Sequence, residues 1–301
     1  MPDTPPPPSA DGPGPLVVVD DPADPGLAAY RDLNDPARRR SVEADGSIFV
    51  VEGKLAVERL LSSGYAVRSL LVDDHQVSSA APLVDAVRAT GAPVFVGTRA
   101  VVAATVGFAL HRGVVAVADR PTPVDADQLL ADLAHQAGAA DGPPLLTVLE
   151  GLNDHENVGA LFRNAAAFGV SGVILDPTCA DPLYRRSVRV SMGHVLHVPF
   201  ARLDPWPAGL ARVRAAGCVV AALAPHPTAG DVPSVTLADL RDRRVADGVG
   251  LALLLGAEGP GLSAEALAAA DVVVSIPMAD GVDSLNVATS AAVALYALVQ
   301  G

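Results

Sequence analysis

The sequence predicts an α/β fold with two domains. The chain has 301 residues, which is enough for two modest hydrophobic cores. Half of its residues are apolar, as expected of a globular protein and not of a disordered one. Short apolar runs bounded by turn residues alternate with helix-like segments, and such runs are typical of a parallel sheet covered on both faces.

The distribution of proline and glycine predicts four segments. Residues 1–24 are crowded with proline, aspartate and glycine, and we expect a disordered tail. Residues 25–120 form a first α/β domain. Residues 121–144 form a linker that begins with Pro-Thr-Pro, ends with Gly-Pro-Pro and holds one short helix, and residues 145–301 form a second domain.

Strand and helix alternate in the first domain. The segment at residues 53–63 has apolar residues at helical spacing and stops at Gly64, as a helix does. The same reading predicts strands at residues 47–51, 67–72, 93–96 and 114–118, and further helices at residues 82–89 and 101–108. This alternation favours a small sheet with packed helices.

The second domain continues the alternation after the linker helix at residues 127–135. A helix over residues 158–168 is closed by Gly169. The expected strands lie at residues 145–149, 173–175, 195–198, 219–223, 251–255 and 272–276. Further helices are expected at residues 184–192, 210–216 and 264–269, and a last helix starts at Ser284.

The charge balance restricts the possible partners. A formal net charge of −13 counts against nucleic acid as the default partner, because phosphate binding leaves a basic footprint. An RNA-binding protein of this composition needs locally concentrated arginines. Two places offer them, residues 38–40 and the group Arg185, Arg186 and Arg189; a solvated surface run is the alternative for each.

Other features exclude several classes of protein. Cys179 and Cys218 read as reduced thiols of a cytoplasmic protein, and no Cys/His cluster suggests a metal site. The N-terminus lacks the basic and apolar regions of a signal peptide. Residues 284–299 carry no charge, but they are rich in small residues, so a helix buried within a soluble protein explains them better than a membrane span.

A glycine-rich loop at residues 256–261 follows an apolar strand and precedes a helix, where nucleotide-binding loops lie. Its glycine spacing matches no phosphate-binding pattern, and Glu258 at its centre would repel a phosphate. The loop instead suits close approach to an uncharged or positive group, such as an adenosine bearing a sulfonium. An ordinary tight turn is the alternative.

Two further motifs carry polar residues. Asn157 is expected to cap a helix whose Arg163 lies among apolar neighbours, so the guanidinium either forms a structural ion pair or faces an RNA phosphate or the reacting ribose. Ser284 and Asn286 stand at the start of the uncharged last helix. They are either a cap and a buried hydrogen-bonding residue, or polar groups directed into a site that the loop also borders.

The three motifs occur in the order residues 157–163, 255–263 and 276–287. In this order they resemble the SpoU-type (TrmH-like) RNA ribose 2′-O-methyltransferases of the SPOUT superfamily. The resemblance implies a C-terminal parallel-sheet domain with a trefoil knot, S-adenosylmethionine as cofactor, and a homodimer whose sites are completed across the interface. Residues 48–118, with the join at residues 111–116, look like the small RNA-binding domain, similar to ribosomal protein L30e, of many members.

The resemblance also implies roles for particular residues. The cofactor would be held by Gly256, Ile276 and Leu285, with help from Met278, Leu223 and Ala224. The catalytic group would comprise Arg163, Asn157, Glu258, Ser284 and Asn286. The chain departs from the family pattern at Asn164 and Ala288. The expected substrate is tRNA or 23S-type rRNA; a non-catalytic RNA-binding protein with this fold, an NAD-binding enzyme and a base-nitrogen methyltransferase are the alternatives.

Overall fold

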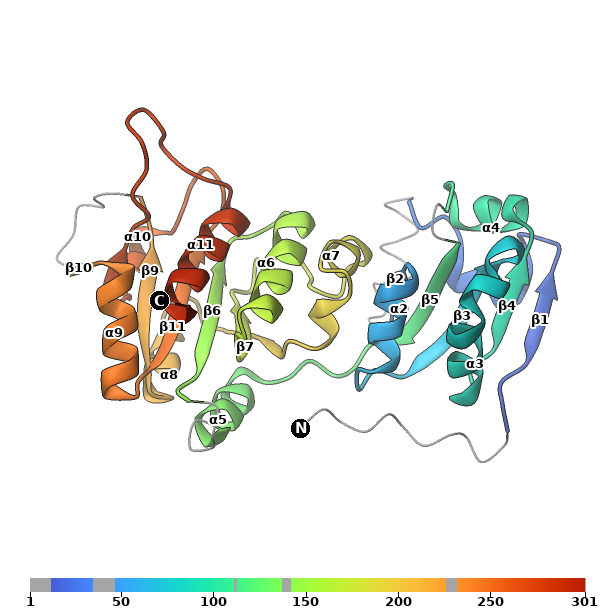
Figure 1. Ribbon diagram of the computed structural model, residues 1–301, viewed down its shortest axis with the longest axis horizontal. Coiled ribbons are helices and arrows are strands. Elements are labelled where there is room, and N and C mark those ends of the chain that lie inside the picture. The colour runs from blue at the N-terminus through green and yellow to red at the C-terminus, as the bar shows by residue number, and fades with distance from the viewer. Residues whose placement is uncertain (1–11, 35–46, 111–112, 137–141, 226–231, 301) are drawn as a thin grey trace. The chain divides into compact units, whose positions relative to one another are not determined.

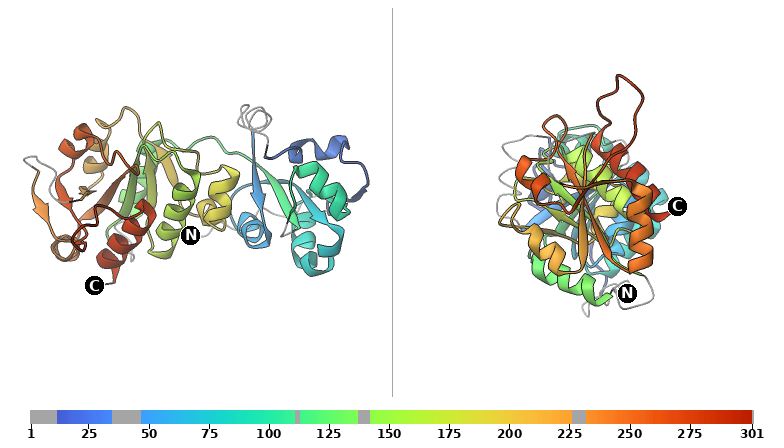
Figure 2. Two further views of the ribbon diagram at one scale, coloured as in Figure 1. Left: turned by 90° about the horizontal axis from the view of Figure 1, so that it is seen from above. Right: turned by 90° about the vertical axis from the view of Figure 1, so that its left-hand side faces the viewer.

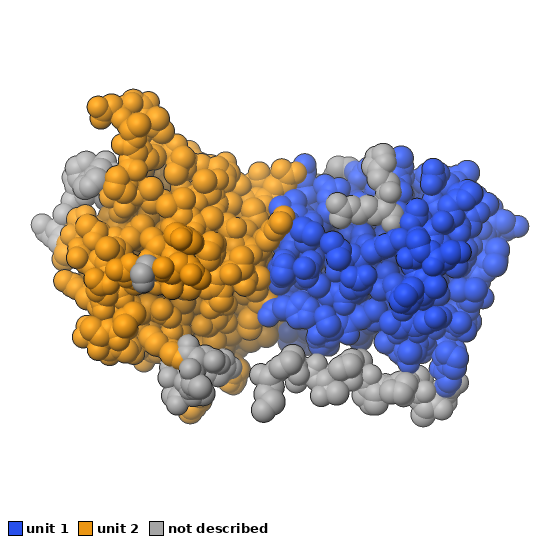
Figure 3. All heavy atoms as spheres, in the orientation of Figure 1, with its two compact units in different colours: residues 1–122, 183–197 blue, residues 123–182, 198–301 orange. Residues whose placement is uncertain are grey.

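The computed structural model describes residues 12–34, 47–110, 113–136, 142–225 and 232–300 (Figure 1). The chain divides into two compact units (Figure 3). The first comprises residues 1–122 together with residues 183–197, and the second comprises residues 123–182 and 198–301. Residues 183–197, expected in the second domain, therefore pack with the first unit.

The sheet of the first unit has the strand order β1-β4-β3-β5-β2. Its strands are β1 (Leu16–Val19), β2 (Ile48–Glu52), β3 (Val67–Asp73), β4 (Val94–Gly97) and β5 (Val114–Asp119). Strands β1, β4 and β3 are parallel, whereas β5 is antiparallel to both β3 and β2. The strand β1 lies in the segment that was expected to be a disordered tail, so that prediction is wrong for these residues.

Short helices cover this sheet. They are η1 (Pro25–Tyr30), α2 (Lys54–Leu61), η2 (Asp74–Gln76), η3 (Ser78–Ala80), α3 (Ala81–Ala89), α4 (Arg99–Val106), α7 (Arg185–Val190) and η4 (His194–Leu196). The element η4 replaces the strand predicted at residues 195–198. It follows Gly193, whose φ of 85° turns the chain, and the Ser191 hydroxyl accepts a hydrogen bond from the Val195 amide, which favours a helical turn there.

The second unit contains a fully parallel sheet with the order β10-β12-β9-β11-β6-β7-β8. The strands are β6 (Leu145–Glu150), β7 (Gly172–Leu175), β8 (Phe200–Arg202), β9 (Cys218–Leu223), β10 (Ser234–Val235), β11 (Gly250–Gly256) and β12 (Val272–Val274). The predicted parallel sheet is confirmed. Its central strands are buried on both faces, as their continuous apolar character requires.

Helices pack on both faces of this sheet (Figure 2). They are α5 (Ala126–Gln136), α6 (His155–Ala167), α8 (Leu210–Ala215), α9 (Leu237–Asp247), α10 (Ala264–Ala268) and α11 (Val287–Val299). Leucines of α5 and α8 join one core cluster with alternate strand residues such as Leu146, Val148 and Leu254. Helix α5 is thus part of the second unit's core, although its residues were expected to belong to a linker.

The C-terminal segment brings the third motif back to the sheet. Between β12 and α11 the chain forms a loop that projects from the sheet (Figure 1). Helix α11 begins at Val287 and not at Ser284, because the Asn286 side chain accepts hydrogen bonds from the first turn. Among the described residues, no helix combines the length and apolar character needed to cross a bilayer.

Candidate active site

A cavity of about 770 Å³ lies in the second unit, where strands β9, β11 and β12 end. Ligand sites of open parallel sheets lie at this edge, outside the carboxyl ends of the strands. Three separated segments line the cavity: the end of β9, the loop after β11, and the stretch from Ile276 to the start of α11. The volume is that of a small-molecule site.

Backbone packing explains the glycine at the start of the loop after β11. A Cβ atom on Gly256 would lie 2.4 Å from the carbonyl carbon of Gly261 and from the Leu262 nitrogen, so the loop folds back directly onto this position. The Gly261 amide donates to the Ala257 carbonyl oxygen over 3.0 Å, and Gly261 has a φ of 72°. The loop therefore presents its backbone and the Glu258 side chain to the cavity.

A polar cluster joins the three motifs. The Asn286 Nδ2 group donates to Asn157 Oδ1 over 2.9 Å and also to Glu258 Oε1. The Val287 amide donates to the same carboxylate oxygen over 3.3 Å. The carboxylate thus faces the N-terminus of α11, where the helix dipole favours a negative charge. Along the chain Asn286 is 129 positions from Asn157 and 28 positions from Glu258.

The sequence had suggested that Asn157 caps α6, but this prediction is wrong. The cap is Asp154, whose Oδ1 accepts from the Glu156 amide over 2.7 Å. Asn157 is the third residue of the helix, and this leaves its side chain free to bond with Asn286. The prediction erred because aspartate and asparagine cap helices about equally well, and the first of the two along the chain satisfied the amides.

Arg163 lies on the exposed face of α6 and does not line the cavity. Within the described part of the chain it forms no hydrogen bond or ion pair, so the structural ion pair, one of the two alternatives for Arg163, is not present among these residues. Its neighbour Asn164 instead points inward and donates to the Ala288 carbonyl oxygen over 2.7 Å, which ties α6 to α11. The Arg163 guanidinium is left facing solvent.

The cavity contains most of the residues that the resemblance singled out. All six expected cofactor-contacting residues line it: Leu223, Ala224, Gly256, Ile276, Met278 and Leu285. Of the expected catalytic residues, Glu258, Ser284 and Asn286 line it, whereas Asn157 reaches it through Asn286. The sequence interpretation missed Pro225, Leu267 and Ser290, because apolar and small lining residues carry no signal of their own.

The arginines predicted as possible RNA contacts differ in their burial and in their distance from Glu52. The side chain of Arg185 is only 14 % exposed, and its Nη1 lies 2.9 Å from Glu52 Oε2. It also donates to Asn34 and lies over the Phe108 ring, so Arg185 is a structural residue of the first unit. Arg189 is 45 % exposed and lies 3.8 Å from the same Glu52 oxygen. Residues 38–40 lie outside the described residues.

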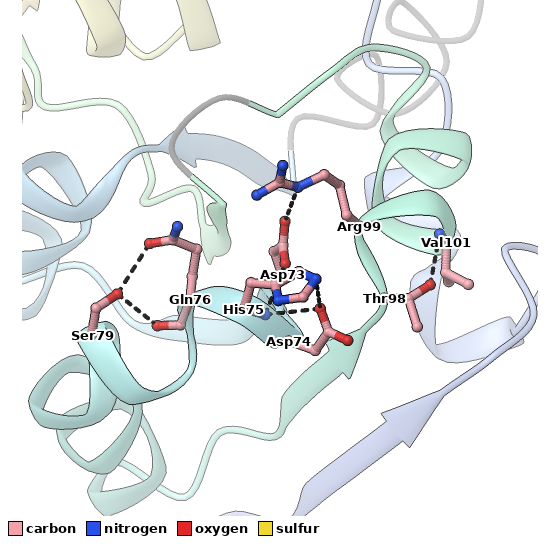
Figure 4. Close-up of polar contacts among 8 residues, drawn as sticks. All are labelled: Asp73, Asp74, His75, Gln76, Ser79, Thr98, Arg99 and Val101. Carbon is pink, nitrogen blue, oxygen red and sulfur yellow. Dashed lines mark hydrogen bonds and ion pairs between the residues drawn. The ribbon is translucent and has the colours of Figure 1, made fainter.

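One group of possible metal ligands occurs among the described residues, at Asp73, Asp74 and His75 (Figure 4). Arg99 pairs with the buried Asp73 carboxylate over 3.2 Å, and the His75 amide donates to it. Burial raises the pKa of Asp73, but the hydrogen bonds to its carboxylate and the charge of Arg99 outweigh burial. The pKa of this carboxyl therefore lies below its usual value. The carboxylate already has its counter-charge, so we assign no metal here.

Comparison with known proteins identifies the family. The model of the SpoU rRNA methylase family matches residues 144–296. An uncharacterized tRNA/rRNA methyltransferase of Mycobacterium tuberculosis is 43% identical over 278 residues, which are 92% of this chain and 90% of that protein. The 23S rRNA (guanosine-2′-O-)-methyltransferase of Shewanella oneidensis is 30% identical over 83% of this chain and 96% of that protein.

A solved structure agrees with these similarities. The crystal structure of an AdoMet-bound rRNA methyltransferase from Sinorhizobium meliloti superimposes with a TM-score of 0.73. The two sequences are 25% identical, and the match covers 94% of this chain and 97% of that one. The ordered motifs, the parallel sheet and these matches lead to one conclusion: the chain belongs to the SpoU rRNA methylase family.

Proposed function

We propose that this protein transfers a methyl group from S-adenosylmethionine to a ribose 2′-hydroxyl of tRNA or 23S-type rRNA. The observation that carries the proposal is the meeting of three distant motifs around one cavity. The similar protein of Shewanella oneidensis is a guanosine-2′-O-methyltransferase, and the similar structure from Sinorhizobium meliloti is AdoMet-bound.

The chemistry of the cavity fits S-adenosylmethionine. Among the described residues that line it, the one ionisable side chain is that of Glu258, an acid. A cavity without a basic side chain disfavours phosphates and favours a ligand with positive charge, such as a sulfonium. The rest of the lining consists of apolar side chains, loop backbone and the neutral polar residues Ser284, Asn286 and Ser290, which suit an adenine ring and hydrogen bonds to its edges.

Two groups of residues would hold this cofactor. We assign backbone contacts to Gly256, Ile276 and Leu285, since each lies in a stretch without regular secondary structure or at a strand end, where amide and carbonyl groups are available. Side chains of Leu223 and Met278 would pack against it, and the Ala224 position would give it room.

When bound, S-adenosylmethionine supplies an electrophilic methyl group on sulfur. The chain's own groups must align the ribose hydroxyl and accept its proton as the oxygen–carbon bond forms and the sulfur–carbon bond breaks. Glu258 is the carboxylate available at the cavity for the proton. Asn286 donates to that carboxylate, and Asn157 orients Asn286 by accepting from the same amide group. The Ser284 hydroxyl has no hydrogen-bond partner among the described residues and would bind the ribose.

Arg163 would act as an electrostatic clamp. A guanidinium stays protonated, so stabilising the developing alkoxide or a neighbouring phosphate suits it better than accepting a proton. Because Arg163 lies outside its own cavity, we propose a homodimer in which it serves the site of the second copy. The adjacent helix α11 leaves Val293, Tyr296 and Val299 exposed, and these apolar side chains would contribute to the dimer interface.

Two finer features of the fold belong to the same proposal. The loop between β12 and α11 would take part in a trefoil knot that shapes the cofactor site. The first unit would resemble ribosomal protein L30e and bind the RNA. Ultraviolet crosslinking of the full protein to RNA, followed by peptide mapping, tests the second point; crosslinks confined to the second unit would contradict it.

The test of function is a product analysis. Purified protein is incubated with radiolabelled S-adenosylmethionine and with tRNA or 23S-type rRNA transcripts, and the RNA is digested to nucleosides for mass spectrometry. We expect a 2′-O-methylated nucleoside. A methylated base would show a different acceptor, and RNA binding without any label transfer would favour a non-catalytic RNA-binding protein.

A further inference from the structure

A buried carboxylate lies beneath the glycine-rich loop, at Glu150. This residue ends strand β6 and is 8 % exposed. A buried carboxylate is costly unless hydrogen bonds or a cation compensate it. Within the described residues Glu150 has no ion pair, and three neutral donors surround it: the Trp206 indole at 2.7 Å, the Ser263 hydroxyl at 2.7 Å and the Ser263 amide at 2.9 Å.

These contacts place both ends of the loop at a single residue. Gly256, at the start of the loop, lies opposite Glu150 in the parallel ladder between β11 and β6. Ser263, at the end of the loop, donates to the Glu150 carboxylate twice and also caps α10 by accepting from the Ala266 amide over 3.1 Å. The backbone of Glu150 therefore fixes where the loop begins, and its side chain fixes where the loop ends.

Between these ends the loop is held at one side chain, Glu258, which accepts from Asn286 and from the Val287 amide. Its internal hydrogen bond runs from the Gly261 amide to the Ala257 carbonyl oxygen, and Gly259 and Gly261 have positive φ values. Glycine segments have many accessible conformations, so ordering them at binding would reduce ligand affinity. All residues from 256 to 262 line the cavity, so an anchor at Ser263 sets the shape of one wall.

We infer that Glu150 is a positioning residue that preorganises the glycine-rich loop for S-adenosylmethionine. The inference rests on the function proposed above, because it assumes that this ligand occupies the cavity. Trp206 completes the arrangement: its indole N–H orients the carboxylate, and its ring packs against the core below the sheet. Supporting groups of this kind keep a site within its productive geometry although they do not touch the ligand.

A set of variants separates this role from a merely structural one. Glu150→Ala removes the anchor, Glu150→Gln keeps one carbonyl acceptor, and Trp206→Phe removes the indole donor alone. Asp271→Asn is the matched control: the Asp271 carboxylate also accepts from a backbone amide, that of Val220 at 2.8 Å, and from Arg214 at 2.9 Å, but Asp271 does not line the cavity.

Calorimetry with S-adenosylmethionine gives the main readout, with thermal unfolding measured in parallel. We expect Glu150→Ala to raise the Kd about thirtyfold, and Glu150→Gln and Trp206→Phe to raise it about threefold, with KM for the cofactor rising and kcat retained at saturation. The control should lower the melting temperature and leave the Kd unchanged.

The sole tryptophan offers an independent probe. Because the sequence has one Trp, the indole N–H gives one resonance in a ¹⁵N-labelled sample of the full protein. We expect this proton to be protected from solvent exchange in the native protein and unprotected in Glu150→Ala. If Glu150→Ala does not fold, the indole resonance and Kd of Glu150→Gln and Trp206→Phe decide the question.

The outcomes are distinct. A native protein that binds the cofactor, together with folded Glu150 variants of unchanged Kd, overturns the inference and leaves the proposed function standing. Cofactor binding with the expected losses but without a 2′-O-methylated product overturns the proposed reaction and supports the role of Glu150. A native protein without affinity for S-adenosylmethionine overturns both.

Discussion

Two arginines that the sequence singles out, Arg185 and Arg163, lie in opposite environments. Arg185, in the first unit, is almost buried, pairs with Glu52 and lies over Phe108. Burial lowers the pKa of its guanidinium, and the neighbouring Glu52 charge partly offsets this. Arg163, in the second unit, is exposed and has no polar partner among the described residues.

The sequence had suggested the reverse. Arg185 stands in a run of arginines typical of a solvated surface, whereas Arg163 stands among apolar residues that suggested burial. The difference arises from partners that are distant along the chain, since Glu52 is 133 residues from Arg185. Arg185, whose charge is already compensated, contributes to stability. Arg163 belongs to one of the three motifs, is exposed and has no polar partner among the described residues, so its charge is available for a substrate.

The largest effect is expected at the uncompensated arginine. Arg163→Ala should reduce methyl transfer by about a thousandfold, because an electrostatic clamp in a transition state contributes on this order. Cofactor affinity should stay unchanged, since Arg163 does not line the cavity of its own chain. Single-turnover kinetics and calorimetry measure the two quantities. Loss of cofactor binding in this variant would contradict the division of roles.

The compensated arginine should affect stability instead. Arg185→Ala leaves the Glu52 carboxylate buried without its closest partner, and breaking such a pair lowers the free energy of unfolding by about 3 kcal/mol. Arg189→Ala is the matched control, because Arg189 lies farther from the same oxygen and is half-exposed, so we expect less than about 1 kcal/mol. Denaturant titration measures both. Equal small losses would mean that the buried pair contributes nothing.

The polar cluster at the cavity should show both kinds of effect at once. Asn286→Ala removes the cap of α11, which lowers the free energy of unfolding by about 1 kcal/mol, and it also releases Glu258 and Asn157, so activity should fall. Ser284→Ala should reduce activity without loss of stability, since Ser284 does not cap the helix. If Ser284→Ala lowers the free energy of unfolding as much as Asn286→Ala does, Ser284 and not Asn286 is the cap of α11.

The smallest effect concerns the two buried thiols, Cys179 and Cys218. Burial is the main cause that raises the pKa of Cys179 to about 12 and that of Cys218 to about 11, from 9.0. The pKa of each thiol is higher in the folded protein than in the unfolded chain, so keeping the thiol protonated favours the folded state. This contribution to the free energy of unfolding is complete below about pH 9 and is lost as the pH rises from there through the folded pKa values. Alkylation of the native protein at pH 8 should be slow, and fast labelling would contradict the burial.

The sequence predicted most regular elements because their apolar residues recur at clear spacings. It missed α9, which has a single buried residue, Leu240, and no continuous apolar stripe, although Thr236 and Asp239 form a capping box that could have marked its start. It also missed the edge strand β1, which follows a proline-rich stretch. In both cases tertiary packing supplies the stability that the local pattern does not display.

Local patterns were enough to predict the α/β class, the parallel sheet of the second unit and the identity of the loop and motif residues, because these depend on local periodicity and on residue types at fixed spacing. The folded chain was needed to show which of those residues meet, which arginine is compensated and which residue caps each helix. The contacts of Asn157 with Asn286 and of Arg185 with Glu52 join residues more than 100 positions apart, and they follow from the packing of the whole chain. The caps are local choices between nearby polar residues that cap helices about equally well.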